Sequence, residues 1–365
     1  MKPSLYRFLR PEQLRDTPPL LFLTLGAILS ISFLLLYSAG GGFSPWCVRQ
    51  FIHLLLGLVA FLLLASCPVQ LFTSLAYVFY AAALACLLAT TFLGVVGMGA
   101  QRWINLGFVK FQPSELMRIA LILALSRRLN DVPLTNWKAY VIPLLLMGVP
   151  VLLTLEQPDL GTAILLALSG GSLFFFAQAS PRFFGGSLAL LAGLGPLFWS
   201  FLHDYQKHRI LTFLHPESDP LGKGYHALQS KIAIGSGGVW GKGFLKGTQG
   251  SLDFLPEKHT DFIFTLLSEE WGFVGALTLL GLYVVLIVLN ILLALRAHNT
   301  ASQLIVAGLT VSFASYLVIN IAMVVGLLPV VGIPLPLVSY GGSSLLTLLA
   351  SQGLMISAAS SWRKR

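Results

Sequence analysis

The sequence predicts an all-α, polytopic membrane protein with ten transmembrane helices and a large extracytoplasmic loop between spans 7 and 8. Two observations lead to this fold class. The 365 residues are 56% hydrophobic and only 10% charged, with a mean hydropathy of +0.82. Several apolar runs also reach about 18 residues or more, the length at which a helix crosses a bilayer.

The apolar runs predict spans near residues 20–39, 50–66, 71–93, 113–129, 138–155, 158–178, 183–203, 262–296, 302–325 and 337–360. Residues 1–365 are therefore expected to form a single integral membrane domain, with the extracytoplasmic loop at about 204–261. An even number of spans puts both termini on one side. If that side is the cytoplasm, the short outer loops hold only Arg49, Arg102 and Lys110, as the positive-inside rule requires.

Residues 251–272 are unusually rich in titratable groups for this chain: Asp253, Glu257, His259, Asp261, Glu269 and Glu270. A helix expected from Phe262 would place Asp261, Thr265 and Glu269 at four-residue intervals on one face. A carboxylate there lies where a membrane span begins. If the protein catalyses a reaction, we expect the catalytic site in this segment.

The predicted topology brings every polar segment (100–115, 156–162, 204–261 and 329–342) to the outer side. A transporter more often carries polar groups near the middle of the membrane. The pattern therefore favours a function at the outer leaflet.

Segment 99–118 allows two interpretations. Arg102, Trp103 and Lys110 suit an aromatic and basic belt at headgroup depth, or an anion site. Glu115, at the start of the fourth span, could simply pair with Arg118.

Asp159 begins the sixth span, where a capping role is more common than catalysis. Spans four, six, eight and ten all begin at the outer face in this topology. Their N-terminal dipole ends would suit a phosphate-bearing ligand there.

Residues 223–247 are rich in glycine and contain Lys242, but they lack the order of a phosphate-binding Walker A loop. A flexible loop is the simplest interpretation, although embedded apolar residues favour short helices lying on the membrane. The prolines of segment 326–343 exclude one regular helix and would leave Ser339 beside a cavity. Asn320, inside the ninth span, is expected to bond a neighbouring helix.

These residues also carry a family resemblance. The words QRWINLG, FQPSE, QPDLGT, AIGSGGVWGKG, HTDFIF, EEWGFVGA and LLPVVGIPLPLVSYGGS, in order along nearly the whole chain, resemble the shape, elongation, division and sporulation (SEDS) family. Its members are bacterial peptidoglycan glycosyltransferases with ten spans. The wording around GTQGSLDFLPEKHTDF is most similar to the members that act in cell elongation.

The resemblance implies roles for particular residues. Asp261, in the HTD word with His259, matches the essential catalytic carboxylate of the family. Asp253 matches an acid that also matters in relatives, some of which have Glu there. Arg102, Lys110 and Glu115 match motif positions, and we group Trp103, Asp159, Lys242 and Ser339 with them as expected substrate-binding residues.

The implied reaction polymerises lipid II, a disaccharide-peptide on undecaprenyl pyrophosphate, with inversion. The resemblance also implies a class B penicillin-binding protein as partner, and contact with membrane lipids but not with nucleic acid. A divalent cation (Mg or Mn) could assist, and no organic cofactor is expected. Two rival functions remain: a lipid II flippase, and a scaffold that recruits a transpeptidase without catalysis.

Overall fold

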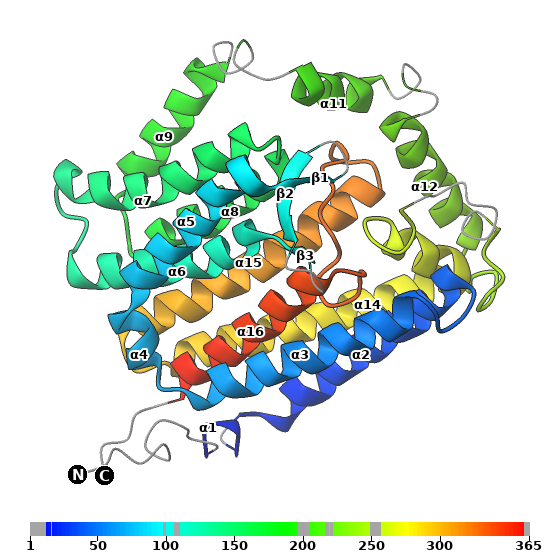
Figure 1. The fold of residues 1–365 in the computed structure, drawn as a ribbon, viewed down its shortest axis with the longest axis horizontal. Helices are drawn as coiled ribbons and strands as arrows, with labels where there is room; N and C mark the ends of the chain where they lie inside the picture. Colours follow the sequence, from blue (N-terminus) through cyan, green and yellow to red (C-terminus); the bar gives the residue numbers. More distant parts are fainter. Residues whose placement is uncertain are drawn as a thin grey trace.

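Long apolar helices make up most of the structure (Figure 1). The computed structural model describes residues 12–15, 17–97, 100–105, 110–195, 200, 204–215, 219, 222–248 and 257–360. The helices are α1 Glu12–Arg15, α2 Pro19–Gly40, α3 Trp46–Ser66, α4 Val69–Ser74, α5 Ala76–Leu93, α6 Pro113–Asp131, α7 Trp137–Glu156, α8 Leu160–Phe176, α9 Pro181–Gly193, α11 Asp204–Leu214, α12 Lys223–Gly237, α14 Ile263–Arg296, α15 Thr300–Val324 and α16 Gly342–Ala359.

Six helices in the described ranges are long and apolar enough to cross a membrane: α2, α3, α7, α14, α15 and α16. α5 and α8 contain shorter apolar stretches, Ala76–Phe92 and Leu160–Phe176. These findings agree with a helical, polytopic membrane protein, while the count of ten spans stays a prediction. The predicted last span begins later than expected, at Gly342, because the prolines before it keep the chain irregular.

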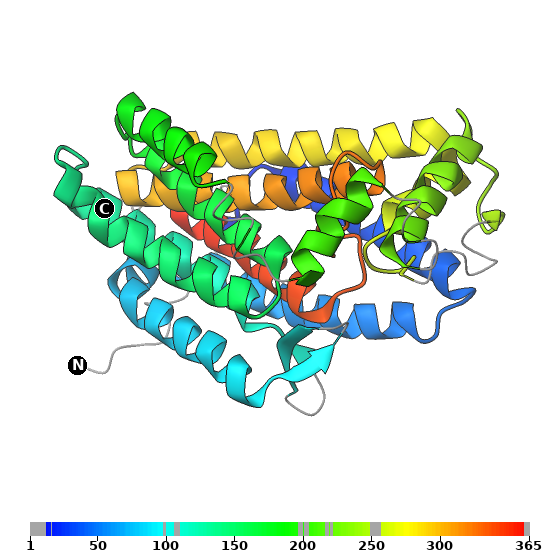
Figure 2. The same cartoon turned by 90° about the horizontal axis from the view of Figure 1, so that it is seen from above.

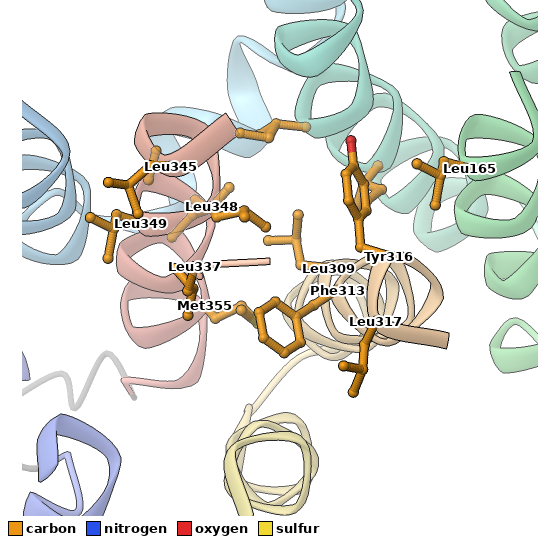
Figure 3. Packing of buried hydrophobic residues seen from close by; sticks show 14 of the residues in the cluster. Leu165, Leu309, Phe313, Tyr316, Leu317, Leu337, Leu345, Leu348, Leu349 and Met355 are labelled. Atoms are coloured by element: carbon orange, nitrogen blue, oxygen red, sulfur yellow. The ribbon is translucent and has the colours of Figure 1, made fainter. Parts of the chain in front are cut away.

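α16 forms the centre of the bundle and is buried along almost its whole length. Figure 3 shows Leu309 and Phe313 of α15 packed toward Leu348 and Met355 of α16. On its other side α16 approaches α3 so closely that a β-carbon at Gly353 would lie 2.4 Å from the carbonyl oxygen of Phe61. Such close contact through a glycine is a common way for membrane helices to associate.

Residues 95–111 contain a small antiparallel sheet that the sequence did not predict. Its order is β1 (Val95–Gly97), β2 (Ala100–Asn105) and β3 (Lys110–Phe111). Val95 pairs with Trp103, and Ile104 pairs with Phe111. The sheet leads directly into Pro113, the first residue of α6, and so fixes where this helix begins.

Two of the helices, α11 and α12, lie within the predicted extracytoplasmic loop. Figures 1 and 2 place them at one end of the bundle, with the C-terminal end of α16 at the other. Short helices in this part of the chain were the expectation from its apolar residues, and the structure confirms them. Ala233 of α12 is fully buried, so this helix packs against the bundle.

Candidate active site

Asp261 lies in the turn that leads into α14, not on the helix itself. Residues 257–262 form turns, the amide of Phe262 donates to the carbonyl of Glu257 at 3.2 Å, and Phe262 is the N-cap residue. The prediction that Asp261 shares a helical face with Thr265 and Glu269 was therefore wrong, because the helix begins only at Ile263 and Asp261 lies in the turn before it. Thr265 and Glu269 are fully buried, whereas Asp261 is partly exposed.

The connection between α15 and α16 holds the backbone of this turn. Ser339 donates its hydroxyl hydrogen to the carbonyl of Thr260 at 2.6 Å and accepts from the amide of Leu335 at 2.8 Å. The amide of Tyr340 donates to the carbonyl of His259 at 2.9 Å. The structure thus brings Ser339 to the site, where its hydroxyl positions the turn.

A second anchor comes from Asn320, a fully buried residue of α15. Its amide nitrogen Nδ2 donates to the carbonyl of Asp261 at 2.9 Å and to that of Ile333 at 2.6 Å. Gly332 has φ +75°, and a β-carbon there would lie 3.5 Å from Oδ2 of Asp261. The carboxylate therefore lies over a residue without a side chain, and the backbone behind it is fixed.

His259 is part of a cluster of rings beside the turn. Its ring stacks on Trp46 with centroids 3.9 Å apart, and Trp46 meets Tyr340 edge-on at 4.8 Å. Burial lowers the pKa of His259 below its usual value, Glu257 raises it and Lys258 lowers it further. The net direction is downward, so the imidazole stays neutral near pH 7 and adds no charge to the site.

Arg102 and Asp159 meet in a polar cluster at the start of α8. Nη1 of Arg102 lies 3.3 Å from Oδ1 of Asp159, and Gln112 donates to Oδ2 at 3.2 Å. Asp159 also accepts from the amide of Thr162 at 3.1 Å, which confirms the expected helix cap. The charge of Arg102 is thus largely balanced by a buried carboxylate.

The Asp159 cluster and the turn that carries Asp261 meet at the same segment, residues 331–333. A β-carbon at Gly161 would lie 3.1 Å from the carbonyl oxygen of Val331 and 3.0 Å from a side-chain carbon of Ile333. Gly332, between these two residues, lies under Asp261. The structure therefore brings Arg102 and Asp159 into the neighbourhood of Asp261 although they are far apart in sequence.

The structure describes three other predicted substrate-binding residues to different extents. Trp103 is half-buried in β2, and its backbone pairs with Val95. The backbone of Lys110 pairs with Asn105 in β3, but its side chain lies outside the described part of the structure. Asp253 lies outside the described residues altogether.

Glu115 lies in the interior between α6, α15 and α16. It pairs with Arg118 at 2.9 Å, as the sequence suggested, and accepts from Tyr316 at 2.7 Å and from Thr347 at 3.0 Å. Glu115 and Arg118 are almost fully buried. Through these contacts Glu115 joins α6 to α15 and α16 in the interior of the bundle.

Lys242 anchors the glycine-rich loop to α14. Its Nζ lies 2.7 Å from Oε1 of Glu269, and its amide donates to the backbone carbonyl of Glu269 at 3.0 Å. A β-carbon at Gly241 would lie 2.1 Å from the carbonyl oxygen of Glu270, so only glycine allows this approach. At Gly272 (φ 66°, ψ −161°) α14 departs from helical geometry. The amide of Phe273, the next residue, donates to the carbonyl of Gly238 in the loop at 2.9 Å. The loop is thus docked, and Lys242 is engaged by a carboxylate.

Sequence reasoning missed two contributors to the site. Gln112 reaches Asp159, and Trp46, from the other end of the chain, covers His259. Gln112 directly precedes the helix-opening Pro113, so its place beside a helix start could have been noticed. Trp46 gave no signal, because only the folded chain brings α3 to the turn. In the described part of the chain no group of three or more His, Cys, Asp or Glu side chains is arranged to hold a metal ion.

Comparison with known proteins agrees at the levels of sequence and structure. The family described as Cell cycle protein (FtsW/RodA/SpoVE) matches residues 17–364. The peptidoglycan glycosyltransferase MrdB of Escherichia coli (strain K12) is 47% identical over 341 residues, which cover 93% of this chain and 92% of that protein. The peptidoglycan glycosyltransferase RodA of Treponema pallidum (strain Nichols) is 32% identical, covering 96% and 99%.

Two solved structures are also similar over most of their length. One, described as "Structural coordination of polymerization and crosslinking by a peptidoglycan synthase complex", has a TM-score of 0.83 at 34% identity and covers 94% of this chain and 98% of that chain. The rod shape determining protein RodA of Thermus thermophilus has a TM-score of 0.73 at 31% identity, covering 94% and 97%.

Proposed function

Because the chain belongs to the FtsW/RodA/SpoVE family of cell cycle proteins, we infer that it is a peptidoglycan glycosyltransferase, as its relatives are named. We propose that its substrate is lipid II and that it polymerises this substrate into glycan strands during cell elongation. One observation carries the assignment to a site. A partly exposed carboxylate, Asp261, stands on a turn whose backbone is fixed by Asn320 and Ser339.

In the proposed step Asp261 is the general base. Its carboxylate takes the proton from the acceptor GlcNAc 4-hydroxyl while the oxygen attacks the anomeric carbon of the donor MurNAc. The bond from that carbon to the lipid diphosphate breaks, and undecaprenyl diphosphate leaves with the electron pair, so the anomeric configuration inverts. The fixed backbone supports this role, since a general base must be held within hydrogen-bond reach of the proton it removes.

The leaving diphosphate needs positive charge, which we assign to Lys110, to the N-termini of nearby helices and to Arg102. In this proposal Arg102 shares its charge between Asp159 and the diphosphate. The meeting of the Arg102–Asp159 pair and the catalytic turn at residues 331–333 supports this arrangement. A divalent cation stays a prediction. Polymerisation by metal-depleted protein with and without added Mg²⁺ or Mn²⁺ tests it.

The deciding experiment incubates the purified protein, alone and with its transpeptidase, with lipid II and resolves glycan strands by gel. General base catalysis is worth about 10²–10⁴-fold, so Asp261→Asn should nearly abolish strand formation and leave the melting temperature unchanged. An Asn variant with normal polymerisation would remove Asp261 from this role.

The two rival functions give different outcomes. A flippase would move lipid II across liposome membranes without forming strands, and a scaffold would form none under any condition. The buried ion pair of Glu115 and Arg118 argues against a flippase. Both residues bond to each other, and Glu115 also accepts from Tyr316, so the pair is held within the bundle.

We further propose that residues 1–365 form a single integral domain of the bacterial cytoplasmic membrane, surrounded by its lipids, with both termini in the cytoplasm. A class B penicillin-binding protein is the proposed partner. The similarity to a protein solved in a peptidoglycan synthase complex that coordinates polymerization and crosslinking supports this pairing. Cysteine labelling of the termini from each side of the membrane tests the orientation.

A further inference from the structure

A small cavity with a polar wall lies deep in the bundle, between α6, α15 and α16. Figure 3 shows part of its apolar side, where Leu348 of α16 faces Leu309 and Phe313 of α15. The polar side is formed by Arg118, Ser312, Ser351 and Gln352. The centre of a water-sized sphere can occupy about 10 Å³ of the cavity, which is close to the smallest volume that holds one water molecule.

Three residues of this wall carry polar atoms that have no hydrogen-bond partner among the described residues. These atoms are Nε and Nη1 of Arg118, Oγ of Ser312 and both side-chain polar atoms of Gln352. Each of the three residues is no more than 2% exposed. Unpaired polar groups are costly in the interior of a protein, so these atoms point to a polar guest in the cavity.

The contacts of Arg118 within the bundle use only part of its guanidinium. Nη2 donates to Oε2 of Glu115 at 2.9 Å, and Cζ lies 4.4 Å from the centroid of the Tyr316 ring. The N–H groups of Nε and Nη1 are left as donors toward the cavity. Because Glu115 balances the charge of Arg118, the guest does not have to be an anion.

The unpaired atoms decide what kind of guest fits. Ser351, the other polar residue of the wall, donates to the carbonyl of Thr347 at 2.7 Å. Arg118 offers only donors and needs an acceptor, whereas Oε1 of Gln352 needs a donor. Water supplies both, while a halide ion cannot donate and a metal cation cannot accept.

We propose that this cavity binds a structural water molecule that joins α6, α15 and α16. The water accepts from Arg118 and bonds to Ser312 and Gln352, and three partners are the usual number for a buried water. Arg118 is then bonded on the side away from Glu115, which helps the ion pair to be tolerated in the interior. The binding of this water is independent of the proposed reaction.

A crystal structure that resolves buried waters tests the site directly, with crystals grown once in sodium chloride and once in sodium bromide. We expect a density peak within about 2.7–3.2 Å of the unpaired atoms of Arg118, Ser312 and Gln352. It should give no anomalous signal in bromide. A map without a peak at this position would overturn the proposal, and a bromide signal there would show a halide site instead.

Melting temperatures of the purified protein test the contribution of the water, because the two possibilities predict opposite signs. Gln352→Met keeps the length of the side chain and removes both polar atoms, and Ser312→Ala removes the hydroxyl. With water bound, each variant deprives it of a partner and should lower the melting temperature by about 2–4 °C. Without a guest, each variant would remove an unpaired buried group and raise the melting temperature.

Ser169→Ala is the matched control. Ser169 is also a fully buried helical serine, but it donates to the carbonyl of Leu165 in its own helix at 2.6 Å and does not line the cavity. Its replacement should lower the melting temperature less than Ser312→Ala does. An unchanged or raised melting temperature in either cavity variant would contradict the proposal, as would equal losses in Ser169→Ala and Ser312→Ala.

Discussion

Replacing Asn320 by Ala should separate the positioning of Asp261 from its chemistry. The variant removes the donor to two backbone carbonyls, those of Asp261 and Ile333. A buried acceptor left without a partner costs about 1–3 kcal/mol. Ile333 is buried, whereas Asp261 is partly exposed and water can replace its lost bond. We therefore expect a loss of about 2 kcal/mol in the free energy of unfolding, nearly all from Ile333.

The effect on catalysis should be larger than the effect on stability suggests, since a displacement of about 1 Å can cost up to 10²-fold in rate. We expect kcat for strand formation to fall at least about 10-fold with KM for lipid II little changed. Asn290→Ala is the matched control. Asn290 is also fully buried in a long helix, but neither of its side-chain polar atoms has a hydrogen-bond partner among the described residues. Wild-type kcat in Asn320→Ala, or equal losses in both variants, would refute the positioning role.

Three further predictions concern the loop and the turn. Lys242→Met leaves buried Glu269 without its cation and should lower the free energy of unfolding by about 3 kcal/mol. Adding Glu269→Gln to this variant should restore most of the lost stability. Thermal unfolding of the single and the double variant measures both effects. Gly241→Ala places a β-carbon against a carbonyl at φ +79° and should undock the loop, seen as faster trypsin cleavage there. Because burial lowers the pKa of His259, the unfolded chain binds more protons below about pH 6.5. Stability should therefore fall on acidification through this range, and His259→Gln should flatten the slope.

The parts of the structure that the sequence predicted are those with local signals. Apolar runs located the long helices. The helix cap of Asp159 and the ion pair of Glu115 were also predictable, because the partner of each residue lies three positions away in the sequence. The strands of residues 95–111 were not predicted, because elements of two to six residues are too short to show a periodic pattern.

The candidate site was less predictable, because its contacts join distant parts of the chain. Asp261 was identified through its motif, yet its surroundings depend on Asn320 and Ser339, which follow it by 59 and 78 positions in the numbering. The pairing of Lys242 with Glu269 could not be predicted, because the two residues lie in different elements. Pairings of this kind leave no periodic trace in a single sequence.

The break of α14 at Gly272 explains how two adjacent acids are tolerated in so apolar a helix. At about 1.5 Å per residue the helix is about 51 Å long, well beyond the roughly 30 Å of bilayer hydrocarbon. The part from Phe273 to Arg296 is about 36 Å long and is sufficient by itself to cross. The surplus turns can then project past the acyl chains, so Glu269 and Glu270 are sheltered by protein and need not contact lipid.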